Sequence, residues 1–304
     1  MERAMEGATN SGRIIDFGFT TQDLTPDLSN LDSVLGRIED SGAGFAELAL
    51  LALDLIAGGR VLPERRRQLE QICGRRQLGY TVHGPLVVNF MDAPNLDLHK
   101  QVCRANLELA GAVGARVVVV HAGIVKSQPE PMLERLYAIQ RDALREMGEV
   151  ARAAGTRIAV ENLFVEEAGL TTPAPARLAA ELERVGHPHV VGTLDFSHAY
   201  LLTSYCGLDF EAQVRAFAPL AGHLHVHDSF GRPPAIKGWT QSENMAFGMG
   251  DLHLPIGWGD LPFECLLPGL PVLEGTVMTV ELPGRFWSEL DAVAASARRL
   301  VELN

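Results

Sequence analysis

The chain of 304 residues is long enough for two average domains or for one large α/β barrel. Hydrophobic residues make up 47% and charged residues 21%, a composition that excludes disorder over most of the chain. The net charge is −12 and lysine occurs only at Lys100, Lys126 and Lys237, which disfavours a protein that follows a phosphate backbone. We therefore expect a small-molecule ligand rather than nucleic acid.

The four cysteines are widely spaced and form no CxxC pair, which is typical of buried thiols in a cytosolic protein. The N-terminus has no apolar run of signal-peptide length, and no segment reaches the roughly 18 apolar residues of a membrane span. The sequence thus predicts a cytoplasmic protein that does not cross a membrane. Residues 1–13 are interpreted as an N-terminal tail and residues 14–304 as one domain.

Short apolar runs typical of β-strands alternate with helical patterns along the whole chain. The predicted strands are residues 14–19, 45–50, 79–83, 116–121, 157–161, 190–195, 222–227 and 277–281. The predicted helices are residues 31–40, 64–77, 95–113, 131–154, 174–185, 209–217, 261–267 and 288–303. Eight such units predict a single (β/α)8 TIM barrel, an α/β fold. A doubly wound open sheet is the alternative, although no Gly-rich dinucleotide turn follows the first strand.

The third to eighth predicted strands all carry His, Asp or Glu at or just beyond their C-terminal ends. These residues are His83, His121, Glu161, Asp195 with His198, the trio His223, His225 and His227, and Glu281, and Asp251 and His253 follow an irregular segment at 230–250. One such residue alone is more often structural, but a structural role explains six consecutive strands poorly. Since the strand ends of a barrel converge, we expect a cluster in which divalent metal ions relieve carboxylate repulsion.

The seventh strand, HLHVHDS, places three histidines on one side because side chains alternate along a strand. We expect that side to face the barrel interior. His223 is then deepest and structural, and His225 is the preferred metal ligand. His227 and Asp228 lie near the rim, where His227 is a candidate substrate contact.

Seven segments together have a familiar order and spacing. They are TVHGPLVVNF (81–90), VVVVHAG (117–123), AVENLF (159–164), GTLDFSHAY (192–200), HLHVHDS (223–229), DLHLPIGWGD (251–260) and VELPG (280–284). In these segments the chain resembles the xylose-isomerase-like barrel superfamily, which contains sugar-phosphate isomerases and epimerases and the type IV apurinic endonucleases. The resemblance covers about residues 14–302.

The resemblance implies up to three metal ions. An inner site would use Glu161, Asp195, His225 and Glu281. A second ion would bind His83 and His121 with Glu161 as a bridge, and a third would bind His198, Asp251 and His253. In many sugar isomerases and epimerases only the inner four residues are kept, and His198 would then contact substrate oxygens. The cofactor implied is one to three divalent ions, with Zn or Mn favoured.

Two mechanisms remain open. In the first, Glu161 and Glu281 act as base and acid in metal-assisted proton transfer on a sugar, sugar phosphate or polyol, giving isomerisation, epimerisation or elimination. In the second, several zinc ions hydrolyse a small phosphoester, or less favourably DNA. Leu86 and Val87 stand where the DNA repair enzymes carry bulkier residues, and basic DNA-contacting loops are not evident. The loop at 253–260 resembles that of isomerase-like members.

Three further sets of residues are candidate substrate contacts, and each also has an alternative role without substrate. Arg232 and Lys237 in the long loop are candidates to clamp an anion, or are solvated charges. Trp258 is a candidate stacking surface for a sugar, or packs structurally. Glu47 faces the mouth as a substrate contact, or forms a salt bridge. Asn162 is expected to orient a carboxylate. Barrels of this type often pair, so a homo-oligomer is compatible with the sequence.

Overall fold

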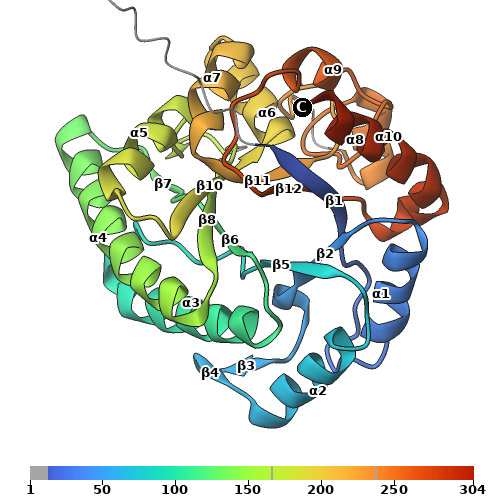
Figure 1. Ribbon diagram of the computed structural model, residues 1–304. Helices are drawn as coiled ribbons and strands as arrows, with labels where there is room; N and C mark the ends of the chain where they lie inside the picture. The colour runs from blue at the N-terminus through green and yellow to red at the C-terminus, as the bar shows by residue number, and fades with distance from the viewer. Residues whose placement is uncertain (1–12, 166, 237) are drawn as a thin grey trace, which may run out of the picture.

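The computed structural model describes residues 13–165, 167–236 and 238–304. Its centre is a closed ring of eight parallel strands in the order β1-β12-β11-β10-β8-β6-β5-β2, surrounded by helices (Figure 1). The strands are β1 (Ile14–Thr20), β2 (Phe45–Ala49), β5 (Gly79–His83), β6 (Val117–His121), β8 (Arg157–Glu161), β10 (Val190–Asp195), β11 (Ala221–Val226) and β12 (Thr276–Val280). This confirms the predicted (β/α)8 barrel and excludes an open sheet.

The helices form the outer layer. They are α1 (Leu31–Asp40), α2 (Pro63–Cys73), α3 (Leu96–Ala112), α4 (Glu130–Ala154), α5 (Pro175–Val185), α6 (Phe196–Cys206), α7 (Phe210–Phe217), α8 (Gln241–Phe247), α9 (Phe263–Leu266) and α10 (Leu290–Leu303). Short 3-10 helices occur at Leu50–Ala52, Ala93–Asn95, Ala218–Leu220 and Gly284–Glu289. Among the described residues, none of the helices is long and apolar enough to cross a membrane. The predicted tail, residues 1–13, lies outside the described residues except for Arg13.

Two short antiparallel pairs lie outside the ring: β3 (Ile56–Ala57) with β4 (Arg60–Val61), and β7 (Val125–Lys126) with β9 (Leu170–Thr171). The second pair joins the loop after β6 to the loop after β8. The last residue of the chain returns to the first strand, because the Ile14 backbone N–H donates a hydrogen bond to Asn304 Oδ1 at 3.1 Å. Helix α10 also packs against β1.

Helix α6 was not predicted from the sequence. Its residues, FSHAYLLTSYC, show no apolar stripe, because most of its first two turns are buried on all sides. The helix begins at Asp195, whose side chain accepts a hydrogen bond from the His198 backbone N–H at 2.7 Å. A strand-end carboxylate therefore starts a helix that carries a candidate metal ligand in its first turn.

The segment 230–250, expected to be irregular, contains helix α8. Thr240 and Glu243 form a reciprocal capping box at its start, and Gly248 adopts a left-handed conformation (φ +63°) at its end. The predicted helix at 261–267 is shorter in the structure, where only Phe263–Leu266 is α-helical.

The barrel interior is filled in layers. Val117, Ala159 and Val191 form a small apolar cluster inside the N-terminal end of the barrel. Side chains two residues apart on a strand share a face. Thr193 and Glu161, which follow Val191 and Ala159 by two residues toward the C-terminal mouth, therefore also face the interior, and both are buried. Polarity thus increases toward the C-terminal mouth, so that the apolar cluster forms the floor beneath the ionisable residues.

Candidate metal centre

The structure brings all nine sequence-predicted metal ligands to the C-terminal mouth of the barrel. They fall into overlapping groups in which ligand atoms lie within 4.8 Å of one another: Glu161, Asp195, His225 and Glu281; His83, His121 and Glu161; and His198, Asp251 and His253 joined by His227. The parallel register explains the grouping, because His121 pairs with Glu161 and Asp195 pairs with His225 on neighbouring strands. These groups are the ones the resemblance implies, with His227 as an addition.

The inner group has three carboxylates around one imidazole. His225 Nδ1 lies 3.1 Å from Glu161 Oε1, 3.6 Å from Glu281 Oε1 and 4.0 Å from Asp195 Oδ2. Glu161, Asp195 and His225 are at most 1% exposed and Glu281 is 8% exposed. Three buried carboxylates this close repel one another unless cations lie among them, so the donor set fits a divalent ion.

A second group surrounds the other oxygen of Glu161. His83 Nε2 lies 3.5 Å and His121 Nε2 3.4 Å from Glu161 Oε2, distances too long for strong hydrogen bonds. Within the described ranges this buried oxygen has no hydrogen-bond partner. An unsatisfied buried carboxylate oxygen between two imidazole nitrogens fits a cation bound by all three groups.

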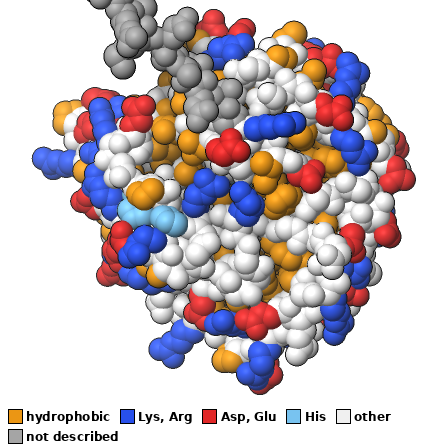
Figure 2. All heavy atoms as spheres, viewed as in Figure 1, with side chains coloured by type: hydrophobic (Ala, Val, Ile, Leu, Met, Phe, Trp, Pro, Cys, Tyr) orange, Lys and Arg blue, Asp and Glu red, His pale blue; other side chains and the backbone are white. Residues whose placement is uncertain are grey.

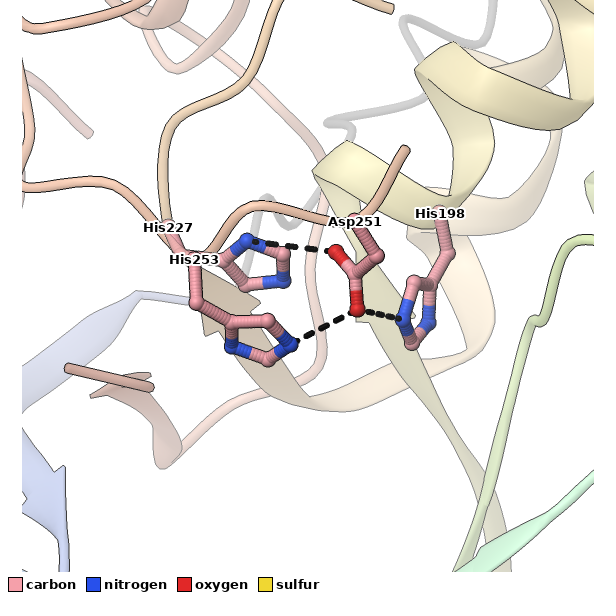
Figure 3. Close-up of side chains that lie close together, drawn as sticks. All are labelled: His198, His227, Asp251 and His253. Atoms are coloured by element: carbon pink, nitrogen blue, oxygen red, sulfur yellow. Dashed lines mark hydrogen bonds and ion pairs between the residues drawn. The ribbon is translucent and has the colours of Figure 1, made fainter. Parts of the chain in front are cut away.

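The outer group lies toward the rim (Figure 3). Asp251 Oδ2 is 2.7 Å from His253 Nε2 and 3.4 Å from His198 Nε2, and Asp251 Oδ1 is 3.7 Å from His227 Nδ1. His198 comes from the first turn of α6, His227 lies one residue beyond the end of β11, and Asp251 and His253 come from the loop after α8. Residues more than 50 positions apart therefore converge on one point.

A buried glutamate supports the inner group from below. Glu47 is fully buried and accepts hydrogen bonds from His223 Nε2 at 2.9 Å and from His225 Nε2 at 3.3 Å. Thr20 and Thr81 also donate to its carboxylate. Glu47 therefore forms a salt bridge, which was the predicted alternative to a substrate contact. Because Glu47 holds His225 by Nε2, His225 Nδ1 is directed toward Glu161.

The charges in the cluster are strongly coupled. Burial alone would raise the pKa of Glu161, but the charge of His225 and contacts with His198, His225 and His83 hold it well below its usual value. Burial lowers the pKa of both neighbouring imidazoles. At His83 the Glu161 carboxylate outweighs burial and raises the pKa to about 9, whereas at His121 burial prevails and lowers the pKa to about 4. His121 thus favours the neutral form in which imidazole binds metals.

Two residues fix the frame around the ligands. Asn162 is buried and pairs with the Asp195 backbone in both directions, donating to its carbonyl and accepting from its N–H, each at 2.9 Å. Asp228 was placed near the rim but is 1% exposed, and its carboxylate accepts from the backbone N–H groups of Ser229, Gly257 and Leu261. It ties the loop after His253 to β11.

The other predicted substrate contacts are more scattered. Trp258 is 45% exposed and packs edge-to-face on Phe286, with ring centres 5.5 Å apart. Arg232 is exposed and bonds its own loop at the Phe247 carbonyl. Neither is among the residues that line the cavity described below. Lys237 lies outside the described residues.

A cavity of about 200 Å³ opens beside the cluster. Its lining includes His83 and Glu281 together with Thr20, Thr21, Gln22, Asp23, Leu24, Ala49, Leu51, Ala52 and Leu86. The segments after β1 and β2 therefore form the wall opposite the metal-ligand candidates. A larger cavity, about 380 Å³, lies between residues 256–265 and α10; its lining includes Asp228 but, among the described residues, none of the nine candidate metal ligands. Of these two cavities, the smaller one therefore borders the candidate metal ligands His83 and Glu281.

A barrel whose strand ends converge on buried carboxylates and imidazoles is an architecture typical of metal-dependent enzymes. The model of the xylose isomerase-like TIM barrel family matches residues 35–303, and the chain belongs to that family. Among curated protein sequences, none matches the chain.

Solved structures share the fold at low sequence identity. A D-tagatose 3-epimerase-like protein has a TM-score of 0.67 at 19% identity, over 94% of this chain and 98% of its own. The 3-keto-D-glucoside 4-epimerase YcjR from E. coli has a TM-score of 0.64 at 18% identity, over 92% and 98%. IOLI protein, with a bound zinc atom, has a TM-score of 0.68 at 15% identity, over 94% and 96%. At these identities the likeness establishes the fold.

Proposed function

We propose that the protein is a divalent-metal-dependent enzyme of the isomerase or epimerase type, or a related lyase, that acts on an uncharged sugar or polyol by proton transfer. One observation carries this proposal: the cavity beside Glu281 and His83 is lined by hydroxyl, amide, carboxylate and apolar groups. Among the described residues, neither Lys nor Arg lines it. Such a lining suits hydroxyl-rich substrates better than phosphorylated ones.

The inner group would hold the ion through Glu161, Asp195, His225 and Glu281. When bound there, a divalent ion supplies Lewis-acid polarisation of a substrate carbonyl, which acidifies the neighbouring C–H. The chain's own residues then move the proton. Glu281, which borders the cavity, takes the proton from the substrate carbon and later releases it to solvent. Glu161, on the other side of His225 Nδ1 and ionised at rest, first takes a proton from solvent and then returns it to that carbon. No net oxidation or reduction occurs.

Other parts of the mouth position the substrate. Thr20, Thr21 and Gln22 offer hydroxyl and amide groups to substrate oxygens, while Leu24 and Leu86 cover the carbon skeleton and exclude water. The similar structures include a D-tagatose 3-epimerase-like protein and an L-ribulose 3-epimerase, so the same fold serves sugar epimerisation elsewhere. Those names support the proposal at the level of reaction class.

Phosphoester hydrolysis is the second candidate. Its supporting observation is that His83 and His121 both face the unsatisfied Oε2 of Glu161, beside the inner group. Two ions bridged by one carboxylate suit a metal-assisted displacement at phosphorus. A small phosphoester fits the net charge of −12 better than DNA does, and on the face seen in Figure 2 acidic and basic side chains are interspersed rather than gathered in one basic patch.

The test compares the two reactions in one preparation. The purified protein, loaded with Zn²⁺ or Mn²⁺, is incubated in D2O with ketohexoses and, separately, with nitrophenyl phosphate mono- and diesters. Deuterium incorporation at the carbon beside the carbonyl, with appearance of the epimer or isomer, supports proton transfer. Turnover of phosphoesters without deuterium exchange overturns it and favours hydrolysis. Glu281→Gln should abolish exchange, and Glu302→Gln, on the exposed side of α10, should leave it unchanged.

A further inference from the structure

His227 departs from the implied three-residue outer site. It lies one residue beyond the end of β11 and is fully buried. Its Nε2 lies 3.2 Å from Asp195 Oδ2, a hydrogen-bond distance, so this nitrogen carries the proton that is donated to Asp195. In the neutral ring, Nδ1 is then an acceptor with a free lone pair.

That lone pair points at the outer group and is unsatisfied. Among residues that the structure describes, neither His227 Nδ1 nor the facing Asp251 Oδ1 has a hydrogen-bond partner, although both atoms are buried. The two atoms are 3.7 Å apart, too far for a direct hydrogen bond, and with the ring proton on Nε2 both atoms are acceptors. Two buried acceptors facing each other are costly unless a cation lies between them.

The surrounding groups are arranged around the same point (Figure 3). The His227 and His253 rings are stacked, with centroids 3.8 Å apart and planes 7° apart, and His198 approaches the His227 ring edge-on at 5.9 Å. His253 has a positive φ of +47°, a backbone conformation that a non-glycine residue adopts at a cost. His253 keeps this strained backbone conformation while its Nε2 lies 2.7 Å from Asp251 Oδ2.

We propose that His227 Nδ1 is a fourth protein ligand, with His198, Asp251 and His253, in a closed tetrahedral zinc site. Three imidazoles and one carboxylate are a ligand set that zinc accepts, and four protein ligands leave no open position for substrate or water. The outer ion is therefore structural. This inference goes beyond the proposed function, since a structural ion is compatible with either reaction.

The same ring connects the outer ion to the inner group. With zinc at Nδ1, His227 would be held in the tautomer in which Nε2–H donates to Asp195 Oδ2. Asp195 is itself a candidate inner ligand, and its other oxygen caps α6 through the His198 backbone N–H. Loss of the outer ion would thus release the Nε2–H donor from an inner carboxylate, and it would also free the helix-borne ligand His198 and the loop-borne ligands Asp251 and His253.

The test measures metal retention rather than turnover. The zinc-loaded wild type, His227→Asn and the control His187→Asn are dialysed against a graded series of chelator, and zinc per chain is measured. His187 pairs with Glu149 far from the mouth. Because loss of a supporting group alone typically lowers metal affinity 10- to 100-fold, loss of a ligand should lower it by at least about 100-fold for one zinc equivalent. Cobalt substitution should give an intense tetrahedral absorption band in the wild type that weakens in His227→Asn.

Equal zinc retention and identical cobalt spectra in wild type and His227→Asn would overturn the proposal. If His227→Asn does not fold, an anomalous diffraction map of zinc-loaded wild type decides the question. A zinc–Nδ1 distance of about 2.0–2.1 Å at His227 supports the fourth ligand. A zinc ion bound by His198, Asp251 and His253 with water in the fourth position refutes it, as does an outer group without zinc.

Discussion

Glu161 and Glu181 are equally buried, each 1% exposed, but they are neutralised in different ways. Glu181, on α5, pairs with Arg141, Arg177 and Arg184 on the outer surface of the barrel. Glu161, at the end of β8, is approached by imidazoles, of which His225 and His198 are nearest. Arginine is always charged, whereas imidazole is not.

The difference separates a carboxylate with a structural role from one that, in the proposed function, binds a cation. The arginines satisfy Glu181 permanently through charge-assisted hydrogen bonds, so its site needs no further group. At Glu161 one oxygen is unsatisfied among the described residues, and the nearby imidazoles offer lone pairs to a metal only when they are neutral. Four predictions test this contrast.

The largest effect is expected for Glu161→Gln. The variant loses a bridging ligand and a proton-transfer group, so turnover should fall by about 1000-fold or more. Secondary structure by circular dichroism should be unchanged, because glutamine keeps the side-chain shape. Near-normal turnover in this variant would remove Glu161 from the chemistry and, with it, the contrast with Glu181.

Zinc should stabilise the fold only by binding to the residues at the C-terminal mouth of the barrel. At a free zinc concentration 100 times the Kd, binding to the native state adds about 2.7 kcal/mol to the free energy of unfolding. Chemical denaturation with zinc and with chelator measures this gain. It should be the same in wild type and Glu181→Gln and smaller in Glu161→Gln, which keeps only the gain from the proposed outer site, to which Glu161 does not belong. An equal gain in all three proteins would place the zinc elsewhere.

Glu181→Gln should lower the free energy of unfolding by roughly 2 kcal/mol. Loss of one partner of a fully buried pair costs about 3–5 kcal/mol, and the partial exposure of Arg177 and Arg184 reduces the cost. Turnover per folded molecule should be unchanged. A loss of activity without a loss of stability contradicts the structural role.

The smallest effect is expected for Glu47→Gln. The hydrogen bonds to His223 and His225 are weakened but not removed, so affinity for the inner ion should fall by about tenfold. Competition with a fluorescent zinc indicator measures the change, and turnover at saturating metal should recover. Failure to recover with excess metal would indicate that Glu47 acts on substrate after all.

The sequence alone predicted the barrel and the convergence of the ligands, because strand ends in a parallel barrel must meet. Strands such as Gly79–His83 and Val190–Asp195 were predicted at their observed bounds. Glu47 was predicted to face the mouth, but it lies in the middle of β2 and therefore one layer deeper than the strand end. The sequence placed His227 near the rim, but it could not show that the ring is fully buried with Nε2 against Asp195.

The pairing of β7 with β9 has a consequence for access to the centre. Val125 pairs with Thr171 and Lys126 with Leu170, and the Ser127 backbone N–H donates to the Gly169 carbonyl at 2.7 Å. The loops that follow His121 and Glu161 are therefore joined by backbone hydrogen bonds, so that these two loops resist moving apart. Small molecules should enter and leave on the opposite side, over the segments that follow β1 and β2.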